Sequence, residues 1–322
     1  MSVLATRTLD ACLACGGSSL AALAMHYEWE GGRFPAVRCT ACGMIFLRVQ
    51  PVGETLARMY ARDYFETDFR CGRSDASSTD EAAFLAENDG LLDRLEPYRG
   101  AGRLLEVGCA SGLLLNRALA RGWQVQGVEL SADAVADARA LGLDVHLGTL
   151  DDAPFAADSF DLAFMGDVLE HVPDCRATLA QVARVLAPGG HVVVRGPITT
   201  HSFARRLGLA LYGALGRSIV LREPPYHLWE FRPASLAALA VRVGLEVVAI
   251  EQSKIPPGPR YGKKSALQAG VMNAIDALNV PVTRAWNAFG DRAVVVARKP
   301  AHQIEFPAPP AWDAPRAPAA GK

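Results

Sequence analysis

The stretch from Arg103 to Leu115 constrains the fold of this chain more than any other part of the sequence. Leu104 to Val107 is a short apolar run, typical of a buried parallel strand, and the residues from Gly112 to Arg121 favour a helix that stops at Gly122. Gly108 lies between the two segments, so backbone amides at the start of the helix can approach a ligand without interference from a Cβ atom. The sequence therefore predicts a strand, a glycine turn and a helix that together bind a small molecule.

Strand-like and helix-like segments alternate after this motif. Strands are expected at 104–107, 124–128, 143–147, 159–165, 191–195, 245–252 and 291–297, and helices follow Ser131, Asp174 and Ser235. Such alternation calls for a parallel sheet that helices cover on both faces. We therefore expect an α/β fold with a Rossmann-like, doubly wound and mostly parallel sheet of seven strands.

Two Cys-x-x-Cys-Gly motifs stand near the N-terminus, Cys12 with Cys15 and Cys39 with Cys42. A tight turn at this spacing directs two thiolates at one ion, and two such pairs complete a tetrahedral Zn²⁺ site. A closed site of four cysteines has no open position for a substrate, so this zinc is expected to stabilise a small zinc ribbon and not to catalyse. Redox pairs, or motifs that have lost the metal, are the alternatives. Trp29 to Phe34 is expected to form a hairpin within the ribbon.

The chain divides into four parts by composition. We expect a zinc ribbon at 1–50, a helical connector at 51–99, the α/β domain at 100–299 with an insertion at 197–232, and a disordered tail rich in proline and alanine at 300–322. The best helical candidates in the connector are 55–60 and 80–95.

Composition also limits the class of function. The chain has 322 residues, half of them hydrophobic, and a formal net charge of -1. This neutrality argues against a broad surface for nucleic acid. No apolar run approaches the roughly 18 residues of a membrane span, and the N-terminus lacks the pattern of a signal peptide. Together with the paired cysteines, these features indicate a cytoplasmic protein.

The motifs resemble, in order, those of the class I S-adenosylmethionine-dependent methyltransferases, and among them the proteins with an N-terminal zinc ribbon (methyltransferase types 11, 12 and 23). Leu104 to Gly112 is similar to the first motif of that family. Gly148 to Phe155 resembles its adenine loop, and Gly166 to Asp174 resembles the motif that follows the fourth strand. Tyr60 to Phe65 is similar to a stretch that helps to cover the cofactor, although packing of the ribbon on the main domain explains it equally well.

The resemblance implies a site for S-adenosylmethionine along the carboxyl ends of the strands. Glu129 is expected to accept both hydroxyls of the ribose, and a solvated acid at the start of a helix is the alternative. Thr149 stands where the family usually has aspartate, so the adenine amino group is expected to contact a backbone carbonyl or Asp151. The expected cofactor residues are Glu106, Gly108, Ala110, Gly112, Glu129, Leu130, Thr149, Leu150, Asp151, Met165 and Asp167.

The insertion at 197–232 is expected to shape the pocket for the methyl acceptor, as insertions after the fifth strand commonly do in this family. Methyl transfer needs an acceptor aligned with the breaking bond, and an alcohol acceptor also needs a base. His227 is the first candidate for this base, with Tyr226 and Glu230 as neighbours. His171 is the second candidate, and a structural role for it is at least as well supported.

An amphipathic segment at 207–215 lies within the same insertion. We expect it to form a buried lid helix. A helix that rests on a membrane surface, where it would reach a lipid-linked substrate, is the alternative.

The resemblance implies an enzyme that methylates a small-molecule acceptor, with O-methylation of a sugar, glycolipid or secondary-metabolite hydroxyl preferred over transfer to nitrogen or carbon. A second hypothesis is an RNA methyltransferase that binds nucleic acid through the zinc ribbon. The neutral charge counts against it, as does the lack of an Asn/Asp-Pro-Pro-aromatic sequence after the fourth strand. A third hypothesis, a scaffold with a vestigial pocket, is disfavoured by intact Gly108, Gly112 and Glu129.

Overall fold

The computed structural model describes residues 4–59, 78–198, 201, 203–253, 280–283, 285–288 and 290–301. Three predictions fall largely or wholly outside these residues: the aromatic stretch from Tyr60 to Phe65, the helices expected between 263 and 289, and the tail beyond residue 301.

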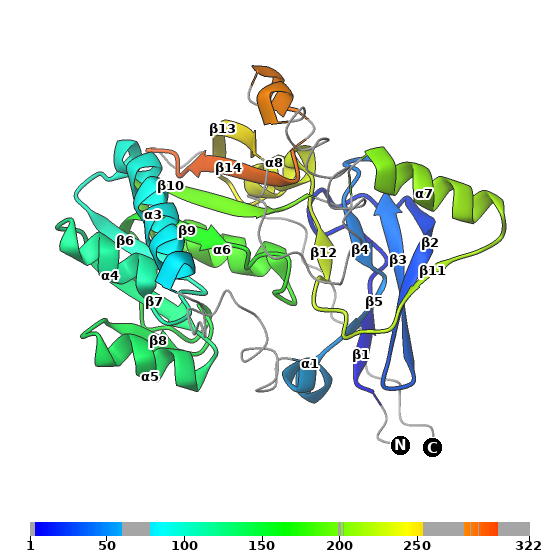
Figure 1. Cartoon of the computed structure of the whole chain (residues 1–322), viewed down its shortest axis with the longest axis horizontal. Coiled ribbons are helices and arrows are strands. Elements are labelled where there is room, and N and C mark those ends of the chain that lie inside the picture. The colour runs from blue at the N-terminus through cyan, green and yellow to red at the C-terminus, as the bar shows by residue number, and fades with distance from the viewer. Residues whose placement is uncertain are drawn as a thin grey trace, which may run out of the picture.

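A seven-stranded sheet forms the main part of the molecule (Figure 1). Its strands are β6 (Arg103–Val107), β7 (Gln124–Glu129), β8 (Val145–Leu147), β9 (Phe160–Gly166), β10 (Leu186–Pro197), β13 (Glu246–Ser253) and β14 (Arg292–Arg298). The strand order is β13-β14-β10-β9-β6-β7-β8, and only β14 runs against its neighbours within this sheet. The prediction of a mostly parallel sheet of seven strands is confirmed.

Helices cover both faces of this sheet. One hydrophobic cluster joins one face to α3 (Ser78–Leu95), α4 (Leu113–Ala120) and α5 (Ala132–Ala140), and a second joins the other face to α6 (Cys175–Val185) and α8 (Pro233–Arg242). A short 3-10 helix, η2 (Glu96–Tyr98), leads from α3 towards β6. Ser131 caps α5 by accepting the Ala134 N–H at 3.3 Å, and Asp174 caps α6 by accepting the N–H groups of Arg176 and Ala177 at 3.0 and 2.8 Å.

The N-terminal part is built around a second, five-stranded sheet. β2 (Leu20–Trp29) and β3 (Gly32–Cys39) form the predicted hairpin, whose turn residues Glu30 and Gly31 have φ of 47° and 80°, as a type I′ turn requires. β4 (Ile45–Leu47) pairs with β3. A separate two-stranded sheet joins β1 (Thr6–Thr8) to β5 (Val49–Pro51), and α1 (Gly53–Met59) follows it.

Both edges of the five-stranded sheet come from the insertion. β11 (Ile219–Leu221) pairs in parallel with β2, and β12 (Trp229–Glu230) pairs antiparallel with β4. Residues of the ribbon, the insertion and α8 also belong to one hydrophobic cluster. The sequence placed 1–50 and 197–232 in separate parts of the chain, whereas the structure joins them in one sheet and one core.

The helix of the insertion, α7 (Phe203–Ala214), lies on this N-terminal sheet, at the right of Figure 1, and packs against β2. Leu209 is buried, whereas Leu211, Tyr212 and the adjoining Leu215 are exposed. The prediction of a buried lid helix is therefore wrong for the C-terminal half of α7, because these apolar side chains face outwards. No helix of the described ranges is long and apolar enough to span a bilayer. Contact of α7 with a membrane surface stays a prediction.

Candidate active site

The carboxyl ends of β6, β7, β8 and β9 lie side by side at one rim of the main sheet. The turn after β6 contains three left-handed residues, Gly108, Ala110 and Gly112, with φ of 72°, 47° and 77°. A Cβ atom on Gly108 would lie 2.4 Å from a methyl group of Val168, and one on Gly112 would lie 2.4 Å from a methyl group of Leu143. Both glycines are therefore required by packing as well as by backbone conformation.

Glu129, at the end of β7, fastens this turn to the neighbouring strand. Its Oε2 accepts the N–H of Ala110 at 2.9 Å, and its Oε1 accepts the N–H groups of Leu130 and Ser131 at 2.8 and 2.9 Å. The side chain is buried, so the interpretation of Glu129 as a solvated acid at a helix start is wrong. A carboxylate has about four acceptor positions, so one remains for a ligand donor beside these three amides.

Glu106 is a second buried acid beneath the same turn. Its Oε2 has no hydrogen-bond partner among the described residues. Burial raises the pKa of Glu106 to about 8, with a further rise from Glu129 and an opposing effect of Arg195. A buried acceptor without a donor is costly, and an ammonium group that enters the turn would satisfy it.

The loop after β8 is closed by a side chain of its own. Asp152 Oδ1 accepts both the N–H and the hydroxyl of Thr149, at 2.7 and 2.8 Å. These bonds lower the pKa of Asp152. Asp151 and Asp152 are both exposed, and a contact of Asp151 with the adenine stays a prediction, whereas the contact of Asp152 with Thr149 was not predicted. The signal was the Thr-x-x-Asp spacing, which is typical of a side chain that caps a turn.

Two apolar residues flank this loop and differ in exposure. Leu150 is buried, whereas Leu130 is 64% exposed although it lies next to the buried Glu129. An exposed leucine beside a buried polar group offers an apolar surface to a flat ring.

The residues at the end of β9 are engaged within the protein. Met165 is fully buried at the end of β9, and a role for it in cofactor binding stays a prediction. Asp167 adopts a φ of 57° and contacts Arg292 Nη2 at 3.1 Å and Arg195 Nη2 at 3.7 Å. Its carboxylate is therefore occupied by two arginines of β14 and β10, and a role in cofactor binding stays a prediction.

The acceptor-side candidates converge where the loop after β9 meets the insertion. The rings of His171 and His227 are 4.8 Å apart at an angle of 78°. His171 Nδ1 donates to the carbonyl of Tyr226 at 3.0 Å, and His227 Nδ1 lies 3.3 Å from Glu230 Oε1. The structure thus brings together the four residues that the sequence proposed.

Glu170 joins this cluster and was missed by the sequence analysis. It is buried, and its Oε1 has no partner in the described part of the chain. Burial raises the pKa of Glu170 to about 7, while His227 opposes the rise. One ligand atom each of Glu170, His171 and His227 lie within 4.8 Å of one another, an arrangement that could hold a divalent cation. The sequence signal was the acid directly before His171, on the loop that leaves a buried strand.

The four cysteines of the ribbon are also brought together. Sγ atoms are 3.6 Å apart for Cys12 and Cys42 and 3.5 Å apart for Cys15 and Cys39, and all four lie within 4.8 Å. Tetrahedral Zn²⁺ with bonds of about 2.3 Å would separate its sulfurs by about 3.8 Å, so this set fits the ion. A hydrogen bond from Cys12 lowers the pKa of Cys42 to about 5, which favours a thiolate there.

The glycines that follow the two Cys-x-x-Cys pairs, Gly16 and Gly43, lie close to two arginines, one in the last turn of α8 and one at its N-cap. A Cβ atom on Gly16 would meet the guanidinium of Arg242 at 2.0 Å, and one on Gly43 would meet Arg232 at 2.7 Å. Four thiolates around Zn²⁺ carry a net negative charge, which these cations would offset. The cluster is therefore packed against the α/β domain.

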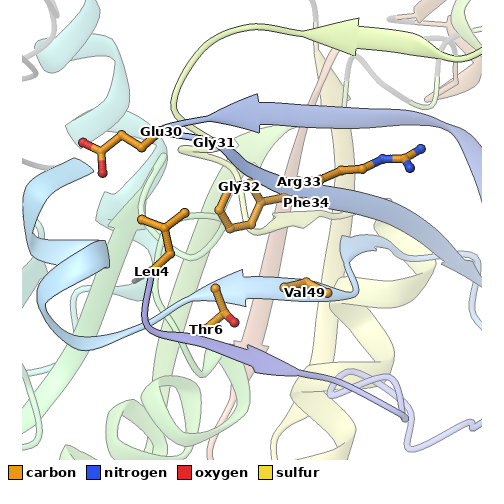
Figure 2. A pocket seen from close by; sticks show the side chains of 8 residues that line it. All are labelled: Leu4, Thr6, Glu30, Gly31, Gly32, Arg33, Phe34 and Val49. Atoms are coloured by element: carbon orange, nitrogen blue, oxygen red, sulfur yellow. The ribbon is translucent and has the colours of Figure 1, made fainter. Parts of the chain in front are cut away.

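A cavity of about 320 Å³ lies elsewhere, at the tip of the β2–β3 hairpin (Figure 2). Leu4 and Phe34 flank Gly32 there, while Glu30 and Arg33 extend in opposite directions. Glu30 pairs with Arg58 at 3.0 Å. The eight lining residues include none of the predicted site residues.

Comparison with known proteins identifies the family. A family model that describes a methyltransferase domain matches residues 80–250, more than half of the chain. The chain belongs to this methyltransferase family. The matched range of the methyltransferase runs from α3 to β13, and therefore contains the glycine turn, Glu129 and both histidines of the acceptor side.

Two curated relatives are ubiquinone biosynthesis O-methyltransferases. The protein of Xanthomonas axonopodis pv. citri (strain 306) is 33% identical over 162 residues, 48% of this methyltransferase and 66% of the relative. The protein of Aromatoleum aromaticum is 30% identical over 159 residues, 46% and 65% of the two chains. The methyltransferase thus spans slightly less than two thirds of the length of these relatives. A SAM-dependent methyltransferase from Archaeoglobus fulgidus aligns with a TM-score of 0.48 and 18% identity, over 73% of this chain and 99% of that one.

Proposed function

We propose that this methyltransferase transfers the methyl group of S-adenosylmethionine to a small-molecule acceptor. The observation that carries the proposal is the pair of acids beneath the glycine turn. Glu129 accepts three backbone amides and keeps acceptor capacity, and Glu106 is buried with an oxygen that lacks a donor among the described residues. Two carboxyl groups beneath one glycine turn suit a ligand that carries both hydroxyl groups and an ammonium group.

The cofactor, when bound, supplies an electrophilic methyl group on a sulfonium. In the proposed site, the remaining acceptor position of Glu129 accepts a ribose hydroxyl, and Glu106 faces the ammonium group. The backbone of Gly108, Ala110 and Gly112 lines the turn. Leu130, Leu150 and the loop closed by Thr149 and Asp152 surround the adenine, with Asp151 at the edge of that loop.

On the acceptor side, the proposed base is His227. Its Nδ1 lies beside the Glu230 carboxylate, and a base held by a carboxylate is the arrangement that activates hydroxyl groups in many enzymes. His171 and Tyr226 hold the opposite wall through their mutual hydrogen bond. The names of the two relatives describe O-methylation, which supports a hydroxyl acceptor over a nitrogen or carbon one.

The proposed Zn²⁺ is structural and is held by Cys12, Cys15, Cys39 and Cys42. Because β11 and β12 cover both edges of the ribbon sheet, the ribbon is continuous with the acceptor side. The formal net charge of -1 favours a small-molecule acceptor over the alternative of an RNA acceptor.

The test has two parts. Isothermal titration with S-adenosylhomocysteine first asks whether the cofactor site exists, and binding at micromolar levels is expected. Tritium transfer from labelled S-adenosylmethionine is then measured against catechols, sugars, lipid-linked phenols and short RNAs. Transfer to a hydroxyl compound supports the proposal. Absence of S-adenosylhomocysteine binding, or transfer to RNA alone, would contradict it.

A further inference from the structure

Gln50, in the middle of β5, is a fully buried polar residue that contacts the acceptor side. Its Oε1 accepts Nε and Nη2 of Arg7 at 3.2 and 2.8 Å, and its Nε2 donates to the carbonyl of Leu228 at 3.4 Å. Leu228 directly follows His227 in the sequence. The side chain therefore connects the two-stranded sheet β1–β5 to the backbone next to the proposed base.

Arg7, opposite Gln50 in the register of that sheet, contacts the other histidine loop. Its Nη2 donates to the carbonyl of Pro173, two residues after His171. Arg7 and Gln50 thus each donate to one backbone carbonyl. One carbonyl belongs to the loop that carries His171, and the other to the loop that carries His227.

The two loops are also joined directly, through Trp229 and the backbone of Glu170. The N–H groups of Leu228 and Trp229 donate to the Glu170 carbonyl at 2.9 and 3.2 Å, and Trp229 Nε1 donates to the Val172 carbonyl at 2.7 Å. These bonds limit relative motion of the loops but leave them able to shift as one body. Gln50 and Arg7 fix that body to the N-terminal part of the chain.

We infer that Gln50 and Arg7 are positioning residues for the His171–His227 pair. The inference rests on the proposed function, because the pair matters for turnover only if these histidines act on the acceptor. Neither residue reaches the imidazoles. They act by holding the Leu228 and Pro173 carbonyls, and a buried glutamine that loses such a partner is costly, so one loop position is strongly preferred. A displacement of about 1 Å at a reacting group can lower the rate about a hundredfold.

Two substitutions separate this role from general stability. Gln50→Leu keeps the volume and removes both sets of hydrogen bonds. Gln50→Glu keeps the acceptor for Arg7 and replaces the donor to Leu228 with an oxygen that repels the carbonyl. Arg48→Ala is the matched control, since Arg48 lies in the same segment but pairs with the exposed Asp10 at 3.2 Å and not with either loop.

The readout is the proton NMR spectrum of the whole protein in solution. The histidine Cε1–H signals in it are assigned with His171→Gln and His227→Gln. The Cε1–H shift of an imidazole depends on the charges and rings around it, so these signals report a displacement of either ring relative to its surroundings. We expect Gln50→Leu and Gln50→Glu to move the signals of His171 and His227, to leave those of His26, His146 and His191 in place, and to keep S-adenosylhomocysteine affinity within about twofold. Arg48→Ala should move none of them.

Unmoved His171 and His227 signals in variants that still bind S-adenosylhomocysteine would overturn the inference. Loss of that binding in both Gln50 variants would also overturn it, because the pair would then serve the fold as a whole. Transfer by the Gln50 variants to an acceptor found in the screen should fall about tenfold to a hundredfold. If the unaltered protein methylates nothing, the proposed function fails, while the ring signals still decide the inference.

Discussion

The imidazoles of His171 and His227 meet edge to face, with centroids 4.8 Å apart, although one follows β9 and the other lies in the insertion. Each is oriented through its Nδ1, His171 by the Tyr226 carbonyl and His227 by Glu230. Because the Glu230 carboxylate would stabilise a protonated His227, His227 is better suited than His171 to accept a proton.

His227→Ala is expected to lower methyl transfer at least about a hundredfold, as for the loss of a general base, and to leave S-adenosylhomocysteine affinity nearly unchanged. Turnover and cofactor titration are measured on the same preparation. His191→Ala is the control, because His191 pairs with Leu162 near the start of β9, away from the carboxyl end of that strand. Normal turnover in His227→Ala would return His171 to first place, and a loss of cofactor affinity would assign the loop a structural role.

Glu129→Ala should weaken S-adenosylhomocysteine binding by about 1 to 3 kcal/mol, because a ribose hydroxyl would lose its acceptor. Glu129 also holds three backbone amides, so Glu129→Gln, which keeps one oxygen, should lose less. Asp133→Ala, in the exposed first turn of α5, is the control and should bind normally. Equal affinity for Glu129→Ala and the unaltered protein would remove Glu129 from the site.

Glu106 should make the protein less stable as pH rises. Its pKa is raised from 4.5 to about 8 in the folded state, so between these values the folded protein holds a proton that the unfolded chain has lost. The free energy of unfolding should therefore fall by up to about 1.4 kcal/mol per pH unit from this group alone. Denaturant unfolding of Glu106→Gln at pH 5.5, 7.0 and 8.5 should give a flatter dependence. Parallel curves for variant and unaltered protein would contradict the assignment.

Elemental analysis should find about one zinc per chain. Cys39→Ser should lower the zinc content, since the hydroxyl is a poor replacement for a thiolate, whereas Cys175→Ala, within the α6 core, should keep it. Full zinc content in Cys39→Ser would mean that the ligand set is wrong.

The main sheet and the N-terminal hairpin were predictable because their signals are local. The apolar runs at 104–107 and 159–165, the caps at Ser131 and Asp174 and the turn at Glu30 and Gly31 are each encoded within a few neighbouring residues. The two Cys-x-x-Cys-Gly motifs are likewise recognised from a spacing within a few residues. These elements form wherever the rest of the chain lies, so the sequence alone locates them.

The acceptor side was less predictable because it depends on distant contacts. β11 and β12 have three and two residues, too few for a periodic pattern, and each pairs with a strand of the first fifty residues. The backbone of the buried Glu170 is held by the N–H groups of Leu228 and Trp229, which belong to the insertion. The apolar stripe of α7 predicted a packed helix, but it could not identify β2 as the surface or reveal that Leu211 and Leu215 stay exposed.

The five-stranded sheet has a consequence for biosynthesis. Its middle strands lie between residues 20 and 47, whereas both edge strands lie between residues 219 and 230. On the ribosome the hairpin is made long before its edges can be covered, and open strand edges pair readily with other chains. The four cysteines of the proposed Zn²⁺ site lie within the first 42 residues. Zinc binding can therefore stabilise the nascent hairpin before its edge strands are made. Expression in zinc-depleted medium should therefore yield aggregated chains, whereas zinc added after synthesis should rescue few of them.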